Sequence, residues 1–202
     1  MNLGKPMAKL ILGVCVLGVG TGSVIGQETI IDNSTEGYYN SDLGTLLDGT
    51  DSDRFPLANT FTGEELIFST EPDLTAAAEV LGDWLATPVP ALGDSWSDLQ
   101  LIPTSWAVNT ETAVVYKVDA GGGYSNLLAT FLIDNGIHIW INGEFRYGAR
   151  QPSPKWFFDV PLGSLGPGLN YVQVLREDSG GYTSYDMQIV GDPAPLPGTQ
   201  CE

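Results

Sequence analysis

One short segment of the sequence combines side chains that could bind a sugar. In a strand over residues 137–142, successive side chains would point to opposite faces. Three isoleucines would then share a core face, while His138, Trp140 and Asn142 would share the other face. A tryptophan beside imidazole and amide groups on a solvent face can stack on a sugar ring and hydrogen-bond its hydroxyl groups. The pattern therefore predicts a glycan-binding face.

Residues of neighbouring strands and loops are expected to extend this face. These are Arg146, Tyr147, Glu177, Asp178 and Tyr182. The alternative is that Trp140 is buried beneath a predicted helix over residues 73–86 or beneath the N-terminal segment. The remaining tryptophans are predicted to serve the core: Trp84, Trp96, Trp106 and Trp156.

A cluster of aspartates suggests a metal site. Asp48, Asp51 and Asp53 lie in one short turn-rich loop, and Asp42 is close in sequence. Hard oxygen ligands on a bendable loop suit Ca²⁺, although the spacing is not that of an EF-hand. We therefore expect no required cofactor, with calcium as a candidate ligand. The alternative is a loop of Asx turns without metal.

Nothing in the sequence has the spacing of a known catalytic motif. His138 is the only histidine and falls in a predicted strand, and no phosphate loop or zinc motif is present. We therefore expect no enzymatic activity. Abundant acidic residues leave an acidic glycoside hydrolase as a reserve prediction, which needs two carboxylates about 5–10 Å apart.

The net charge of the chain argues against some classes of binding partner. The 202 residues include 8 Lys and Arg against 25 Asp and Glu, for a formal net charge of -17. Such an excess of acid argues against nucleic acid and against anionic membrane surfaces. It is also uneven, because residues 27–111 carry 16 acids and one base, Arg54, whereas residues 112–202 carry 9 acids and 5 bases.

The N-terminal segment is typical of an export signal. Residues 1–26 combine Lys5 and Lys9, a short apolar run and small residues before Gln27. The apolar run is far shorter than the roughly 20 residues of a membrane span, although a permanent N-terminal anchor is the alternative. We expect a secreted protein, extracellular or at the cell envelope. Removal of this segment would leave Cys201 as the one cysteine, and so a candidate for a disulfide-linked dimer.

The fold class follows from turns and alternation. The 25 glycines and 13 prolines favour many short elements. We predict a mostly β single domain over residues 27–192, an antiparallel β-sandwich or jelly roll with one helix at 73–86, and a Pro-rich extended tail over 193–202. The predicted strands are Ala113–Asp119, Asn126–Asp134, Ile137–Asn142, Glu144–Gly148, Trp156–Val160, Asn170–Arg176 and Ser184–Val190. The pairs Asn135-Gly136 and Asn142-Gly143 predict hairpin turns.

Four segments carry a resemblance to a known family. They are residues 31–40, 106–113, 134–143 and 175–182. Together they resemble the ectodomain of secreted bacterial PEP-CTERM sorting-domain proteins. The strand–turn–strand around Asn142 with Leu165–Asn170 also resembles galactose-binding-like jelly rolls. The first resemblance implies export and a place at the cell envelope or in extracellular polymer. No C-terminal sorting helix follows Pro195, so we expect either free secretion or a truncated chain.

Two functions are therefore predicted from different classes. The first is a non-enzymatic module that binds extracellular or cell-surface glycan through Trp140 and its neighbours. The second is a structural, matrix or envelope protein that acts by self-association or display.

Overall fold

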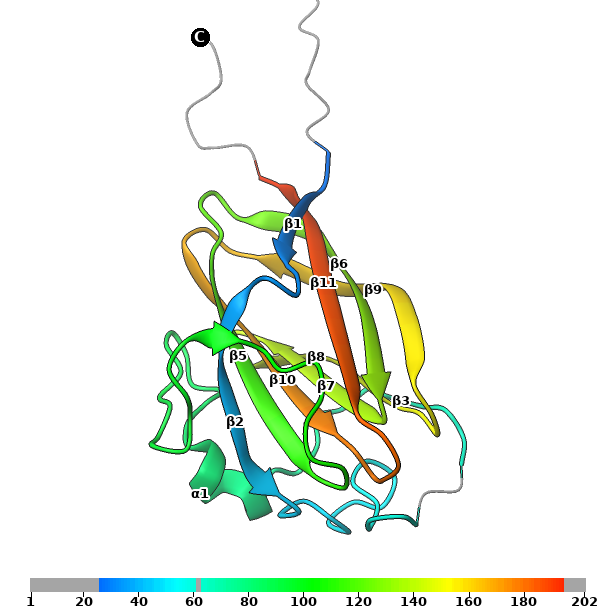
Figure 1. Cartoon of the computed structure of the whole chain (residues 1–202). Coiled ribbons are helices and arrows are strands. Elements are labelled where there is room, and N and C mark those ends of the chain that lie inside the picture. The colour runs from blue at the N-terminus through cyan, green and yellow to red at the C-terminus, as the bar shows by residue number, and fades with distance from the viewer. Residues whose placement is uncertain (1–25, 61–62, 195–202) are drawn as a thin grey trace, which may run out of the picture.

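Two antiparallel sheets form a β-sandwich in the computed structural model, which describes residues 26–60 and 63–194 (Figure 1). The smaller sheet has the order β1 (Glu28–Ile31), β11 (Ser184–Pro193), β6 (Tyr124–Asp134) and β9 (Lys155–Leu165). The larger sheet has the order β3 (Leu66–Phe68), β8 (Glu144–Arg150), β7 (Gly136–Ile141), β10 (Leu169–Glu177), β5 (Glu111–Asp119), β2 (Glu36–Gly44) and β4 (Gln100–Leu101). From β5 onward the chain changes sheet at every connection except β7–β8. The predicted antiparallel sandwich is confirmed.

All seven strands predicted from the sequence are present, and four shorter or irregular strands were missed, β1 to β4. The hairpin at Asn142-Gly143 is confirmed, because it joins the paired strands β7 and β8 and both residues have positive φ, 50° and 75°. The hairpin predicted at Asn135-Gly136 is wrong. That turn carries the chain from β6 in one sheet to β7 in the other.

The core between the sheets follows from alternation along the strands. The isoleucines of β7 point into it and meet side chains of β6, β9 and β11. At one end the core closes around Arg176, which is fully buried. Its guanidinium lies over the rings of Trp106 at 4.5 Å, Tyr185 at 4.6 Å and Tyr39 at 5.3 Å. Aromatic faces attract a desolvated cation, so this cage ties β2, β10 and β11 together.

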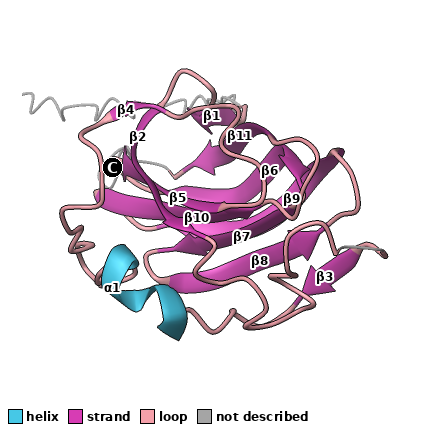
Figure 2. Cartoon of the chain, turned by 60° about the horizontal axis from the view of Figure 1, so that its bottom comes forward, coloured by secondary structure: helices cyan, strands magenta, loops and turns pink. Residues whose placement is uncertain are grey.

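A third layer covers the other face of the larger sheet. It is made by residues 45–99, which we call the cover segment; they connect β2 to β4 and include the helix α1 (Ala78–Leu81), and they also contribute the edge strand β3 to the larger sheet itself. Figure 2 shows α1 and several loops on the side of β7 and β8 that faces away from β6 and β11. Apolar side chains of the cover segment and of the sheet form a second core: Leu43, Leu47, Phe55, Ala77, Leu81, Trp84, Trp96, Ala113, Val115, Trp140, Tyr171 and Leu175.

The helix is shorter than predicted. A 3₁₀ turn at Thr75–Ala77 leads into α1, and the chain leaves the helix at Gly82, whose φ is 60°. Asp73 accepts a hydrogen bond from the Thr75 amide at 2.9 Å, which makes an Asx turn just before the 3₁₀ turn, whose N-cap is Leu74. The predicted extent of 73–86 is therefore wrong at its C-terminal end, because glycine readily adopts the left-handed conformation that stops a helix.

Several sequence predictions fall outside the described residues. These are the signal segment up to residue 25, the tail beyond residue 194 and Cys201. Among the residues that are described, no helix is long and apolar enough to cross a membrane.

Two glycines test how closely the cover segment docks. Gly143 and Gly121 both have positive φ, but a Cβ at Gly143 would lie 2.2 Å from the Leu85 carbonyl oxygen, whereas a Cβ at Gly121 would meet no atom within 4 Å. Gly121→Ala should lower the free energy of unfolding by about 1 kcal/mol through backbone strain. Gly143→Ala should lower it by at least about 2 kcal/mol more, because the cover must move. Equal losses in urea denaturation would contradict this docking.

Candidate functional site

The predicted glycan-binding tryptophan is buried. Trp140 is 0% exposed and lies against Trp84 and Phe145, with ring centroids at 5.3 Å and 5.4 Å. Its indole N–H donates to Glu71 of the cover segment at 3.4 Å. The predicted solvent face is therefore wrong, and the alternative, burial beneath the helix-containing segment, is correct. The alternation in 137–142 separates two cores rather than a core and solvent.

His138 is buried in the same way. Its ring stacks on Phe68 at 5.6 Å and lies 5.4 Å from Phe55. Burial, with a smaller contribution from the Arg54 charge, lowers the pKa of His138 to about 3. Neither ring nitrogen has a hydrogen-bond partner among the described residues. This histidine is a neutral aromatic packing element and not part of a solvent-facing site.

Three further residues of the predicted face have structural contacts. Asn142 accepts a hydrogen bond from the Tyr171 amide at 2.8 Å and fixes the β7–β8 turn. Arg146 pairs with Glu144 at 2.7 Å. Tyr147 packs on the core beside Phe131 and Phe157, and burial raises its pKa to about 12.

The last three residues of that prediction differ in their exposure to solvent. Glu177 and Asp178 are each 1% exposed, and Asp178 accepts hydrogen bonds from the amides of Asn109 and Gly180 at 2.5 Å and 3.1 Å. Tyr182 is 62% exposed in the β10–β11 loop. The eight predicted residues therefore do not form one accessible site.

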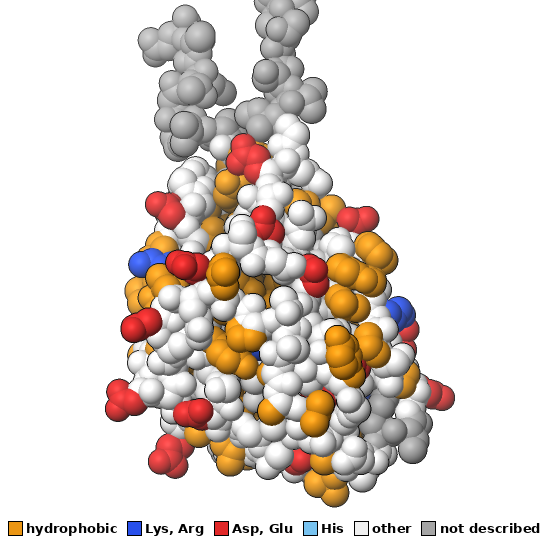
Figure 3. Space-filling model, in the orientation of Figure 1, with side chains coloured by type: hydrophobic (Ala, Val, Ile, Leu, Met, Phe, Trp, Pro, Cys, Tyr) orange, Lys and Arg blue, Asp and Glu red, His pale blue; other side chains and the backbone are white. Residues whose placement is uncertain are grey.

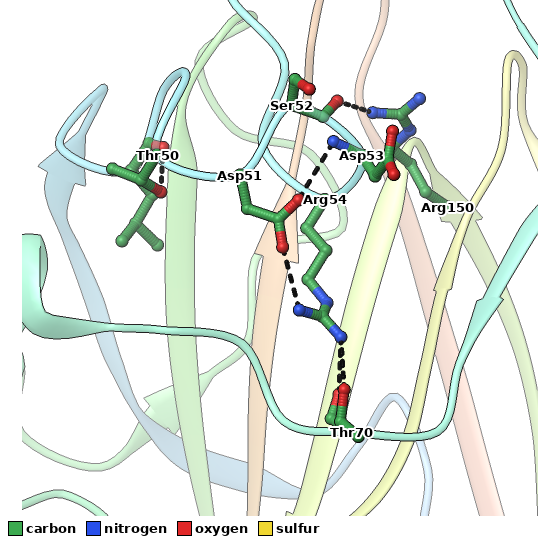
Figure 4. A network of polar contacts seen from close by, with 8 residues as sticks. Thr50, Asp51, Ser52, Asp53, Arg54, Thr70 and Arg150 are labelled. Carbon is green, nitrogen blue, oxygen red and sulfur yellow. Dashed lines mark hydrogen bonds and ion pairs between the residues drawn. The ribbon is translucent and has the colours of Figure 1, made fainter.

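The aspartate loop is held by arginines (Figure 4). Asp51 forms an ion pair with Arg54 at 2.9 Å, and Arg54 also donates to the backbone and side chain of Thr70. Arg150 donates to the Ser52 carbonyl at 2.8 Å. The aspartates of the predicted metal site, Asp42, Asp48, Asp51 and Asp53, are not gathered, and the described residues contain no group of three acidic, histidine or cysteine residues arranged to hold a metal ion. Calcium binding stays a prediction.

A row of buried charged residues crosses the larger sheet beneath the cover segment. Glu177 pairs in register with Gly136, which pairs with Arg150. On the other side Glu177 opposes Glu111, since their neighbours Arg176 and Thr112 are paired. A Cβ at Gly136 would lie 2.8 Å from a carboxylate oxygen of Glu177, so only glycine leaves room for this side chain. Burial and the nearby Asp48 carboxyl raise the pKa of Glu111 to about 9.

These acids match the chemistry of the reserve hydrolase prediction only in part. Burial is the main cause of the raised pKa values of Glu111, Glu177, Asp134 and Asp178. A general acid must also reach the substrate, and these four side chains are at most 2% exposed. Glu111 and Glu177 interact with Asp48 of the cover segment, and Asp178 accepts hydrogen bonds from the amides of Asn109 and Gly180, so the partners of these three acids are parts of the protein itself.

A different surface has the features of a binding site. On β9, Trp156 and Phe158 are 43% and 68% exposed, and their rings lie nearly parallel at 20° with centroids 6.0 Å apart. Phe157 between them is buried against Phe131. Figure 3 shows hydrophobic side chains gathered over the region of β6 and β9, with acidic side chains around the rim. The sequence prediction that Trp156 serves the core is wrong.

A β-bulge shapes this surface. Phe157 pairs with Phe131 and Val160 pairs with Ala129, so Phe158 and Asp159 together face the single residue Thr130. Asp159 absorbs the extra residue with a φ of 52°. Bulges bend a strand and redirect its side chains, here at the edge of the smaller sheet.

A hollow of about 440 Å³ adjoins Trp156, within the size range of about 300–1,000 Å³ for ligand clefts. Its lining combines one aromatic ring with polar groups: Asp32, Asn33, Ser34, Thr130, Trp156, Asp186, Met187 and Gln188. Asp32 is held by hydrogen bonds from the Ser34 amide and hydroxyl at 2.9 Å and 2.6 Å. Gln188 and Thr130 face each other across β11 and β6.

One signal in the sequence could have located this surface. The run Lys155-Trp156-Phe157-Phe158-Asp159 places two aromatic residues at alternating positions, flanked by charged residues. Alternation alone assigns Trp156 and Phe158 to one face. It does not say which face meets solvent, and the residues opposite, on β11 and after β1, are distant in sequence.

Comparison with known proteins leaves the family open. A scan against protein-family models finds no match, and a search of curated proteins also finds none. The resemblance to PEP-CTERM ectodomains stays a prediction.

Buried Glu111 makes stability depend on pH. Its pKa rises from an ordinary 4.5 to about 9, so the folded state holds this proton more tightly than the unfolded chain. The stability from this group is complete below pH 4.5 and is lost as pH rises through 9, by up to about 1.4 kcal/mol per pH unit. His138 has the opposite effect, since its lowered pKa costs stability only as pH falls below 6.5. The melting temperature should therefore fall between pH 6.5 and 9.

Glu111→Gln should flatten that decline and raise the melting temperature at pH 8 relative to the wild type. Glu36→Gln, at an exposed position of β2, should leave the decline unchanged. Parallel curves for the wild type and Glu111→Gln would contradict a proton held at Glu111.

Substitution of two tryptophans, Trp140 and Trp156, tests which of them is buried and which is exposed. Trp140→Ala removes a fully buried ring and should lower the free energy of unfolding by about 3–5 kcal/mol. Trp156→Ala removes an exposed ring and should change it by less than about 1 kcal/mol. Guanidinium denaturation measures both, and similar losses for the two variants would contradict the assigned positions.

Proposed function

We propose that the protein is a secreted, non-enzymatic carbohydrate-binding β-sandwich that binds extracellular glycan on the outer face of its smaller sheet. The observation that carries the proposal is the exposed pair Trp156 and Phe158 beside a polar hollow.

The aromatic pair suits sugar rings. Two nearly parallel rings side by side offer a flat apolar platform, and aromatic faces attract the apolar faces of ligands while leaving their polar edges hydrated. Trp156 is 43% exposed although burial of a tryptophan would contribute substantially to stability. An exposed aromatic patch of this kind is typical of a binding surface.

The hollow supplies hydrogen-bonding groups of the type that saccharide hydroxyls need. Asn33, Gln188 and Thr130 offer amide and hydroxyl groups within one concave surface. The sheet and its bulge fix the backbones that carry Trp156, Thr130 and Gln188, so little ordering would accompany binding.

Self-association through the adjacent sheet edge is less well supported. The edge strand β9 contains Pro161 and the bulge at Phe158–Asp159. Proline and bulges interrupt the row of backbone groups that a second chain would have to pair with. The exposed aromatic pair therefore supports ligand binding better than the edge of β9 supports self-association.

The proposal is tested by binding to a glycan array and to insoluble polysaccharides, with the variants Trp156→Ala and Phe158→Ala. Trp156→Ala should weaken binding about tenfold or more, because the loss of one stacking ring is worth about 1.4 kcal/mol or more. Tyr182→Ala is the matched control, since Tyr182 is an exposed aromatic residue that does not line the hollow.

Three outcomes would overturn the proposal. They are the absence of glycan binding by the wild type, equal binding by the wild type and Trp156→Ala, and a loss confined to Tyr182→Ala. A wild-type dimer that Trp156→Ala converts to a monomer, without glycan binding, would instead support the structural alternative.

A further inference from the structure

The hollow beside Trp156 is acidic. Two of its lining residues, Asp32 and Asp186, carry carboxylates, and none of its lining residues is basic. The nearest base in sequence, Lys155, forms an ion pair with Glu65 and lies over the ring of Phe157 at 5.2 Å. Hydrogen bonds from Ser34 lower the pKa of Asp32 and so favour its charged form. A ligand in this hollow meets negative charge that no lining side chain neutralises.

Both carboxylates lie to one side of Trp156, because Asp186 is on β11 and Asp32 follows β1, the next strand beyond β11. Asp186 pairs in register with Leu132, which pairs with Trp156, so the three residues form one row across β11, β6 and β9. Neighbouring strands are about 4.8 Å apart, which places the backbones of Asp186 and Trp156 roughly 10 Å from each other. A pyranose ring stacked on the indole would extend its substituents across β6 toward Asp186.

Resting on the proposed function, we propose that this hollow selects saccharides that carry a protonated amine, of the glucosamine type. An ammonium group at the ring edge would pair with Asp186 or Asp32, and its charge would also be attracted by the face of Trp156. A uronic acid at the same position would be repelled, and a neutral or N-acetylated sugar would stack without the ion pair. The formal net charge of -17 adds long-range attraction for a cationic glycan.

The direct test compares ligands of one size and different charge by isothermal titration calorimetry at pH 6 and low salt. The glucosamine tetramer should bind about threefold to tenfold more tightly than the N-acetylglucosamine tetramer, which has the same ring without the charge. The galacturonic acid tetramer should bind most weakly. The advantage of the glucosamine tetramer should shrink in 0.5 M NaCl, because salt screens exposed charges.

Variants assign the selectivity to this hollow. Asp186→Asn keeps the shape of the side chain and should reduce the preference for the glucosamine tetramer at least about threefold, with little change for the N-acetylated tetramer. Asp98→Asn removes one negative charge from an exposed loop before β4 and should leave the preference unchanged. An equal effect of both variants would mean general charge attraction and would overturn the proposal.

Three further outcomes distinguish failure of the charge selectivity from failure of the proposed function. Equal binding of charged and N-acetylated tetramers, both weakened by Trp156→Ala, would overturn the charge selectivity and leave the proposed function standing. Binding of a lysine tetrapeptide as tightly as the glucosamine tetramer would overturn the selectivity for a saccharide. Tight binding of the glucosamine tetramer that Trp156→Ala does not weaken would overturn both proposals.

Discussion

The larger sheet is apolar on both of its faces, and the rest of the structure depends on this constraint. Its inner strand β7, next to the central strand β10, is buried at every position, with isoleucines facing the smaller sheet and Trp140 facing away. A sheet of this kind cannot leave either face in water, since the cost is proportional to the apolar area exposed. The cover segment supplies the missing layer. The turn-rich, acidic cover segment therefore encloses a second core.

Packing the cover segment on the sheet brings acidic residues close together, and a few residues offset the resulting repulsion. The cover segment is rich in acid, and the sheet beneath it contributes Glu111 and Glu177. Arg150 links the row of buried charges to the Ser52 carbonyl of the cover segment, and a proton on Glu111 reduces the remaining repulsion. Among the described residues a second buried cation, Arg176, lies in the core between the sheets, where aromatic rings surround it. Each guanidinium thus joins segments that are distant in sequence.

The sequence predicted the strands well and the environment of their side chains poorly. Alternation and turn residues located every strand from β5 to β11, because both are local properties. The first four strands were missed, since polar residues such as Asn40 and Ser41 break the apolar alternation along β2, whose pairing with β5 is also irregular there, and the other three are at most four residues long. Alternation correctly divided residues 137–142 into two faces, yet the partner of the second face is Trp84, 56 residues earlier in the sequence. The contact between Trp140 and the cover segment is therefore visible only in the folded structure.

The same argument explains why the candidate site lies on the smaller sheet. With both faces of the larger sheet covered, the outer face of β6, β9 and β11 is the sheet surface on which alternate side chains reach solvent. In a regular strand every second residue of β9 would point into the core. Trp156 and Phe158 share the outer face in this way, and the extra residue of the bulge opposite Thr130 lets Phe157 and Val160, three positions apart, both point inward. Among the residues that the structure describes, nothing buries the aromatic pair at this bulge, so the pair adds little to the stability of either core. Recognition of a ligand gives the pair a physical reason.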